Sequence, residues 1–99
     1  MNGPRHRLLV CYDVRDPVRL RRTHGTMLGF GDPLQYSVFL CELSPPEQIL
    51  MEEALLGVVK VSEDSLAIIN LGPARGLAAR RIRTLGTATI PPRCRYKIV

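Results

Sequence analysis

The chain has 99 residues, of which 45% are hydrophobic and 23% charged, and its formal net charge is +5 at pH 7. This length corresponds to one domain, residues 1–99, with a small core, and the hydrophobic content argues against disorder. No apolar run approaches the roughly 20 residues of a membrane span. The apolar run after the basic N-terminus is short and ends in Asp13, so we expect no signal peptide and a cytoplasmic protein without membrane contact.

The cysteines and the basic residues narrow the class of protein further. The three cysteines are widely spaced and form no Cys-x-x-Cys motif, which argues against a zinc cluster and a disulfide framework. The basic residues comprise twelve Arg and only two Lys. Because Arg suits bidentate phosphate contacts, this composition favours a nucleic-acid partner. A solvated basic surface is the alternative interpretation.

The first half of the chain predicts a strand, a helix and a further strand region. Residues 8–12 form an apolar run typical of a strand buried on both faces, and we expect this strand over about residues 7–14. Asp16 and Pro17 then predict a helix to about residue 28, because Asp is a preferred N-cap and Pro is favoured at the first helical position. Residues 34–43 are strand-like but long, so one bulged strand and two short strands fit equally well.

A second helix is predicted from Ser44 to about residue 60. Ser44 is the expected N-cap, Pro45 takes the first helical position, and Glu47 completes a capping box. The remaining segments are, in order, a buried strand over 64–71, a short helix or ordered loop over 74–85, and strand-like segments at 87–90 and 94–99.

This order of elements predicts an α+β protein with the ferredoxin-like βαββαβ fold. A three-stranded α/β sandwich with two helices on one face is the alternative. Both arrangements place the first strand centrally and Asp13 at its C-terminal end, which is a usual place for function in sheets of this kind.

Asp13 is the strongest candidate for a functional residue. It closes an apolar strand, where a carboxylate is costly unless something pairs with it, and Asp16 already caps the following helix. We therefore expect Asp13 to serve a ligand or a metal. One carboxylate holds Mg²⁺ poorly, because the ion wants octahedral oxygen ligands, but a two-fold dimer would bring a second Asp13.

Other candidate residues surround this position or lie near the C-terminus. Arg15, Arg19 and Arg22 either clamp a phosphate or neutralise the carboxylate, and we favour the phosphate contact for Arg19. Phe39 is expected in the core, with base stacking as its alternative role. A basic cluster that is either a solvated face or a DNA-backbone contact comprises Arg75, Arg80, Arg81 and Arg83.

Two motifs lie at a distinctive spacing. They are Tyr12-Asp13-Val14 followed by Asp16 and Arg19, and Gln35-Tyr36-Ser37-Val38-Phe39 followed by Cys41-Glu42-Leu43. Together they resemble the CRISPR-associated Cas-two family, the small subunit of the spacer-acquisition machinery. The similarity covers about residues 8–71. Pro33 departs from the pattern, since many members carry a basic residue there.

The resemblance implies a ferredoxin-like homodimer in which a C-terminal strand extension, residues 86–99, joins the sheet of the partner. It also implies a complex with the CRISPR integrase that holds duplex DNA, and a Mg²⁺-dependent nuclease activity on RNA or DNA centred on Asp13. The alternative function is a small ferredoxin-like nucleic-acid-binding or regulatory module without catalysis.

Overall fold

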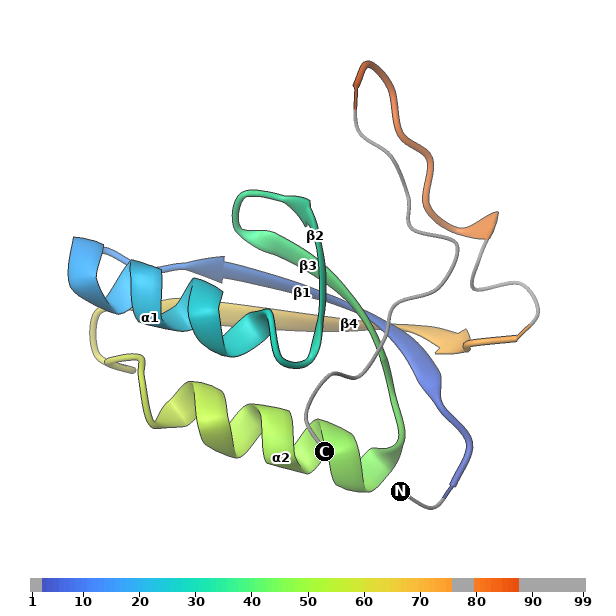
Figure 1. Ribbon diagram of the computed structural model, residues 1–99, viewed down its shortest axis with the longest axis horizontal. Helices are drawn as coiled ribbons and strands as arrows, with labels where there is room; N and C mark the ends of the chain where they lie inside the picture. The colour runs from blue at the N-terminus through green and yellow to red at the C-terminus, as the bar shows by residue number, and fades with distance from the viewer. Residues whose placement is uncertain (1–2, 76–79, 88–99) are drawn as a thin grey trace.

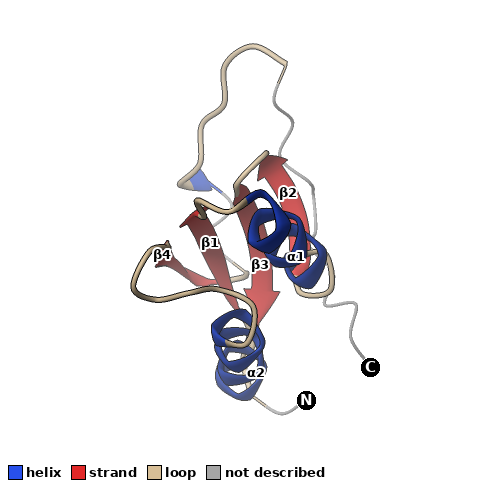
Figure 2. Cartoon of the chain, turned by 90° about the vertical axis from the view of Figure 1, so that its left-hand side faces the viewer, coloured by secondary structure: helices blue, strands red, loops and turns tan. Residues whose placement is uncertain are grey.

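The computed structural model describes residues 3–75 and 80–87. Within them the elements follow the order β1 (His6–Asp13), α1 (Pro17–Met27), β2 (Gly31–Gln35), β3 (Val38–Leu43), α2 (Pro45–Leu56) and β4 (Ser65–Pro73). The strands form one antiparallel sheet in the order β2-β3-β1-β4, and both helices cover the same face of it (Figures 1 and 2). The ferredoxin-like fold and the central position of β1 are confirmed.

Both helices begin where their capping residues predict. The Asp16 carboxylate accepts a hydrogen bond from the Arg19 backbone N–H at 2.9 Å. At the start of α2, the Ser44 hydroxyl accepts from the Glu47 N–H at 3.4 Å, and Glu47 Oε1 accepts from the Ser44 N–H at 2.8 Å. These bonds satisfy backbone donors that lack an intrahelical partner.

The end of α2 differs from the prediction, because the helix stops at Leu56 rather than near residue 60. The carboxylate of Asp64 accepts the Lys60 N–H at 2.8 Å, and the Asp64 N–H donates to the Lys60 carbonyl at 2.8 Å. This turn fixes the chain before β4 and replaces the last helical turn that the apolar pattern had suggested.

Residues 34–43 belong to two strands rather than one, joined by a turn at Tyr36 and Ser37. The first of them, β2, begins earlier than expected, at Gly31. A Cβ at Gly31 would collide with the carbonyl oxygen of Leu40 on the neighbouring strand, so the close approach of β2 to β3 requires glycine here. Pro33 is tolerated because β2 lies at the edge of the sheet.

The core lies between the sheet and the helices. It includes Leu8, Val10 and Tyr12 of β1, Phe39, Cys41 and Leu43 of β3, and Met27, Phe30, Met51 and Leu55 from α1, α2 and the connection to β2. The other face of β1 carries Leu9, Cys11 and the exposed Asp13. The two faces of β1 are therefore not equally buried.

The fourth strand, β4, is less buried than the sequence predicts. Residues 64–71 were predicted to form a buried strand, but β4 is an edge strand whose side chains are exposed or half-buried. Only Leu66 and Ile68 pack against the core, because α2 reaches just one side of β4. Gly72 has φ = 104°, a conformation that favours glycine, and the strand continues through it to Pro73.

The C-terminal predictions are only partly covered by the described residues. Residues 74 and 75 form a turn, and 80–87 are irregular rather than helical. The expected strands at 87–90 and 94–99 lie, apart from Thr87, outside the described residues. No helix in the described part of the chain has the length and apolarity needed to cross a membrane.

Candidate functional site

Asp13 lies at the end of β1, where it pairs with Ser65 of β4. Its side chain is exposed, so the expectation of a carboxylate under burial penalty is wrong. Exposure has a different consequence: the Asp13 carboxylate makes no hydrogen bond or ion pair with the residues described, and it faces solvent where a ligand can reach it.

A shallow depression of about 300 Å³ surrounds this carboxylate. Its lining comes from β1, β4, β3 and the turn before β3, and comprises Cys11, Tyr12, Asp13, Ser37, Val38, Ser65, Leu66 and Ala67. The Tyr12 N–H donates to the Ser37 carbonyl at 3.1 Å, which holds the turn beside β1. The strand end, the turn and the start of β4 therefore form one site, whose lining includes two serines and one acidic residue.

Arg19 is not directed at Asp13 or at solvent. Its guanidinium donates to Asp64 through Nε at 2.9 Å and Nη2 at 3.1 Å, and Nη2 also reaches Glu63 at 3.2 Å. The Asp64 side chain is 0% exposed. The hydrogen bonds from Arg19 hold the pKa of that carboxyl well below its usual range, against the opposing effect of burial. The expected phosphate contact of Arg19 is replaced by this ion pair.

Asp64 also accepts the Arg15 backbone N–H at 3.1 Å. Since Arg15 follows Asp13 by two residues, this bond fixes the loop that leaves the candidate site. The Arg15 and Arg22 side chains are exposed and remain available to a phosphate. The sequence patterns did not identify Asp64 as a residue that holds the loop beside Asp13. The acidic Glu63-Asp64 pair directly before a strand is the signal that could have indicated it.

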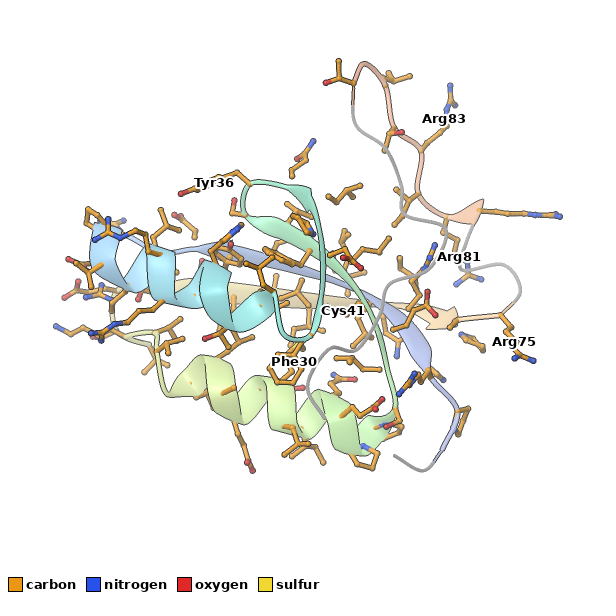
Figure 3. All side chains as sticks on the ribbon, in the orientation of Figure 1. Phe30, Tyr36, Cys41, Arg75, Arg81 and Arg83 are labelled. Carbon is orange, nitrogen blue, oxygen red and sulfur yellow. The ribbon has the colours of Figure 1, made fainter. Side chains whose placement is uncertain are left out.

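The C-terminal basic cluster does not join this site. Arg80, Arg81 and Arg83 are exposed and follow β4 in the chain. Figure 3 shows Arg81 and Arg83 beyond the end of β4, away from the end of β1. Arg81 Nη1 donates to the Leu71 carbonyl at 2.9 Å, whereas Asp13 pairs with Ser65. At about 3.3 Å per strand residue, the two positions along β4 are roughly 20 Å apart.

Phe39 cannot stack on a base, because its side chain is 0% exposed. Its ring packs against Tyr12, with ring centroids 6.2 Å apart, and against His24, with centroids 5.2 Å apart. The core role expected for Phe39 is thus observed, and the alternative stacking role is wrong for this fold. Among the described aromatic residues the exposed one is Tyr36, in the turn before β3.

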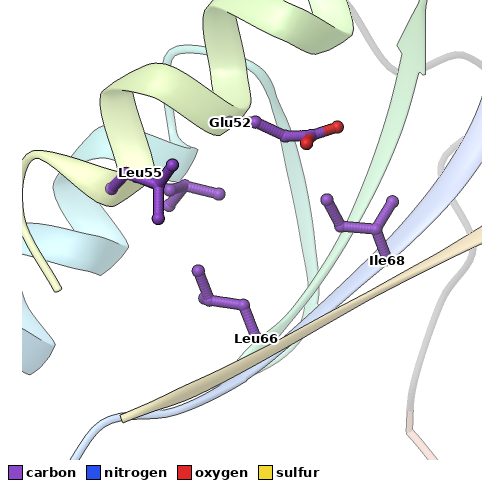
Figure 4. Close-up of a pocket in the computed structure, with 5 residues that line it drawn as sticks. Glu52, Leu55, Leu66 and Ile68 are labelled. Carbon is purple, nitrogen blue, oxygen red and sulfur yellow. The ribbon is translucent and has the colours of Figure 1, made fainter. Parts of the chain in front are cut away.

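A separate apolar groove of about 260 Å³ lies between α2 and β4 (Figure 4). It is lined by Glu52, Leu55, Leu56, Leu66 and Ile68. The groove borders the edge strand and carries a single charged side chain, so its chemistry suits an apolar segment of protein better than a phosphate.

The fold and the two motifs define a small ferredoxin-like α+β protein, and comparison with known proteins identifies its family. The family model "CRISPR associated protein Cas2" matches residues 6–75. The chain belongs to this family, as the sequence motifs predicted.

Relatives and solved structures agree with this assignment. The chain is 38% identical over 94 residues to "CRISPR-associated endoribonuclease Cas2" of Geobacter sulfurreducens, which covers 95% of this chain and 97% of the relative. It is 35% identical over 83 residues to "CRISPR-associated endoribonuclease Cas2 1" of Rhodospirillum rubrum, covering 84% and 80%. The crystal structure of Streptococcus pyogenes Cas2 at pH 6.5 superposes with a TM-score of 0.71 at 32% identity, covering 81% of this chain and 99% of that one.

Proposed function

We propose that this protein is a homodimeric adaptor of CRISPR spacer acquisition that acts in the cytoplasm, binds duplex DNA or RNA together with the CRISPR integrase, and cleaves nucleic acid at a Mg²⁺ site formed by two Asp13 carboxylates. Family membership supports the CRISPR role, and the relatives named as endoribonucleases support the cleavage. The observation that carries the proposal is the exposed Asp13 carboxylate in the depression at the end of the central strand.

The described residues of one chain do not complete a metal site. Among the described residues, no group of three or more His, Cys, Asp or Glu side chains could hold a metal ion. Magnesium is typically held by one or two carboxylates together with water, so Asp13 needs a second carboxylate. A symmetric dimer contact would supply it from the equivalent residue of the partner. The ion would then provide an acidified water and stabilise charge on the phosphate.

Dimerisation has its own support in the sheet. Within the described residues β4 pairs on one side only, and an exposed edge strand invites a further strand. The extension at residues 86–99 ends in the strand-prone Tyr96-Lys97-Ile98-Val99. We propose that this tail adds to the sheet of the partner, where the groove between α2 and β4 offers apolar contacts. A chain truncated after Ile90 should sediment as a weaker dimer, and an unchanged dimer would contradict the exchange.

Phosphate contacts are assigned to the exposed arginines. Arg15 and Arg22 lie on the α1 side of the site, and Arg80, Arg81 and Arg83 extend the basic surface beyond β4. Arg19 contributes indirectly, because its ion pair with Asp64 holds the loop that carries Arg15.

The test of the metal site is Asp13→Asn, which keeps the shape of the side chain and removes its charge. Cleavage in Mg²⁺ should fall to the level seen with chelator, while folding, dimerisation and DNA binding remain. Glu53→Gln, which removes an exposed carboxylate from α2, is the matched control and should cleave normally. Cleavage retained by Asp13→Asn would assign the activity to another centre, and loss of folding would make Asp13 structural.

A further inference from the structure

The two helices on the sheet carry opposite charges. Helix α1 has three arginines and no acidic residue, whereas α2 has the acidic residues Glu47, Glu52 and Glu53 and no basic one. Both helices cover the same face of the sheet (Figure 2). In a chain with a net charge of +5, an acidic helix calls for a ligand other than the phosphates assigned to the exposed arginines.

The exposed side of α2 is apolar as well as acidic. Ile49 and Leu56 are each 59% exposed. They are seven residues apart, which is about two helical turns, so they lie along the same side of the helix. Met51 and Leu55 supply the buried side. A helix that is apolar on more than one side is typical of a helix that is covered on more than one side.

Glu52 places a negative charge between these apolar side chains. It follows Ile49 by three residues and precedes Leu56 by four, so it neighbours both on the helix surface. Glu52 Oε2 accepts a hydrogen bond from Gln48 Nε2 at 3.0 Å, but it makes no ion pair within the described part of the chain. Glu47, in contrast, is buried and pairs with Arg5 at 2.8 Å. The charge of Glu52 is therefore available to a ligand.

The three residues Ile49, Glu52 and Leu56 define what we call the α2 surface. It is continuous with the groove between α2 and β4, because Glu52 and Leu56 also line that groove (Figure 4). The depression around Asp13 is lined by β1, β3, β4 and the turn before β3, and by no residue of α2. A ligand of the α2 surface would therefore bind separately from the proposed cleavage site.

The chemistry of the α2 surface selects among the possible ligands. A nucleic acid would bring phosphates to the Glu52 carboxylate, and α2 of a second copy would bring glutamates, so both meet like charge. The basic helix α1 of a second copy would be attracted, but such a head-to-tail contact does not close and would continue into a filament. A basic, apolar helix of a different protein satisfies both the charge and the apolar residues.

We propose that the α2 surface is a docking site for a partner protein, which it contacts through a basic amphipathic helix of that partner. Contiguous exposed apolar residues with a charged rim are typical of protein interfaces, and an amphipathic helix contributes apolar side chains at matching spacing. The inference goes beyond the proposed function, because it assigns a protein contact to a surface that cleavage does not use.

The probe is a labelled synthetic peptide that forms a helix, with leucines at i, i+3, i+4 and i+7 and lysines elsewhere. Since the net charge of the protein repels this peptide in general, its binding in fluorescence anisotropy requires a local acidic and apolar surface. Ile49→Ser and Glu52→Gln should each weaken binding at least about 5-fold, as expected for residues within an interface. Val18→Ser, which alters an exposed apolar side chain of the basic helix α1, is the matched control and should bind like the wild type.

A second peptide of the same composition, with its leucines distributed around the helix, tests the geometry. It should bind the wild type more weakly than the first peptide does. Equal binding of the two peptides, or no binding of the first, would overturn the inference.

Two further measurements distinguish the other possible ligands. Weaker binding of duplex DNA by Glu52→Gln would assign the surface to nucleic acid, and growth beyond a dimer in sedimentation that Ile49→Ser abolishes would assign it to copies of this chain. Either result would overturn the inference. Urea midpoints of both variants should match the wild type, because the altered side chains are exposed. Asp13→Asn should bind the peptide normally, so the docking site and the proposed cleavage can fail independently.

Discussion

The Asp64 carboxylate connects three separate parts of the chain beneath the candidate site. It binds the Arg19 side chain on α1, the backbone of Arg15 in the loop after β1, and the backbone of Lys60 in the turn after α2. A buried carboxylate is costly unless it is paired and hydrogen-bonded, and these partners satisfy it. Ser65 follows Asp64 directly and pairs with Asp13. The Asp64 carboxylate therefore fixes both the loop after Asp13 and the start of the neighbouring strand β4.

Asp64→Asn should destabilise the fold. The amide loses the negative charge that pairs with Arg19, and the Arg19 side chain is only 22% exposed, so an incompletely solvated positive charge remains without its closest partner. The urea midpoint should fall below that of the wild type and further than for Glu53→Gln, which alters an exposed carboxylate. Equal midpoints for the two variants would show that the Arg19–Asp64 pair adds nothing to stability.

The same carboxylate predicts how stability depends on pH. Hydrogen bonds from Arg19 lower the pKa of Asp64, and those from Lys60 and Arg19 lower the pKa of Glu63. Carboxyl groups in the unfolded chain titrate near pH 4, so the unfolded state binds protons first as the pH falls. The stabilising contribution is therefore complete above about pH 5 and decreases below it. Urea midpoints measured across this range should decline less steeply for Asp64→Asn, and parallel curves for the two proteins would contradict the linkage.

At the scale of elements, capping residues in the sequence predicted where both helices start. The end of α2 and the exposure of β4 depend instead on contacts between residues far apart in the chain. Ser44 and Glu47 form their capping box within four residues of chain, so its residues were visible in the sequence. The end of α2 depends on Asp64, and the exposure of β4 depends on its place at the edge of the sheet. Neither follows from an apolar pattern, which Val58 and Val59 extended beyond the true end of α2.

In the candidate site, too, some residues could be predicted from local sequence, whereas others depend on contacts between distant parts of the chain. Asp13 and Ser37 belong to the sequence motifs and lie together in one depression. The partner of Arg19 is 45 residues away in the chain, and the support of Tyr36 by His24 joins α1 to a turn between strands. Such pairs are created by the packing of elements, so residue type and local spacing could not identify them.

The capping box gives a prediction for α2 as a unit. Ser44→Ala should cost about 1 kcal/mol of unfolding free energy, because the Glu47 N–H loses its acceptor in a site that solvent does not reach. Ser62→Ala, in the exposed turn before β4, should stay within about 0.5 kcal/mol of the wild type. Urea denaturation of both variants measures the difference. A loss for Ser44→Ala no larger than the control would mean that the packing of α2 alone determines its start.

At the scale of the whole molecule, the exposed arginines lie at both ends of the sheet. Arg15 follows Asp13 at one end, and Arg83 lies beyond β4 at the other (Figure 3). The net charge of +5 favours the binding of polyanions in general. The separation of the arginines along the sheet is more specific, because it requires an extended polyanion. The strand rise from Ser65, which pairs with Asp13, to Leu71, whose carbonyl accepts from Arg81, is roughly 20 Å, so a nucleic acid that contacts both ends must extend along the sheet.

Salt dependence tests whether one nucleic acid contacts both ends. Arg15→Gln and Arg83→Gln should each weaken binding to duplexes of any sequence and lower the slope of log K against log salt by about 1, because each removes a phosphate contact. Their free-energy effects should add in the double variant, since the two sites are far apart. Ser62→Ala, which changes no charge, should leave the slope unaltered. An effect from Arg83 but not Arg15 would confine the contact to the C-terminal cluster, and a sharp sequence preference that survives high salt would refute binding through phosphates altogether.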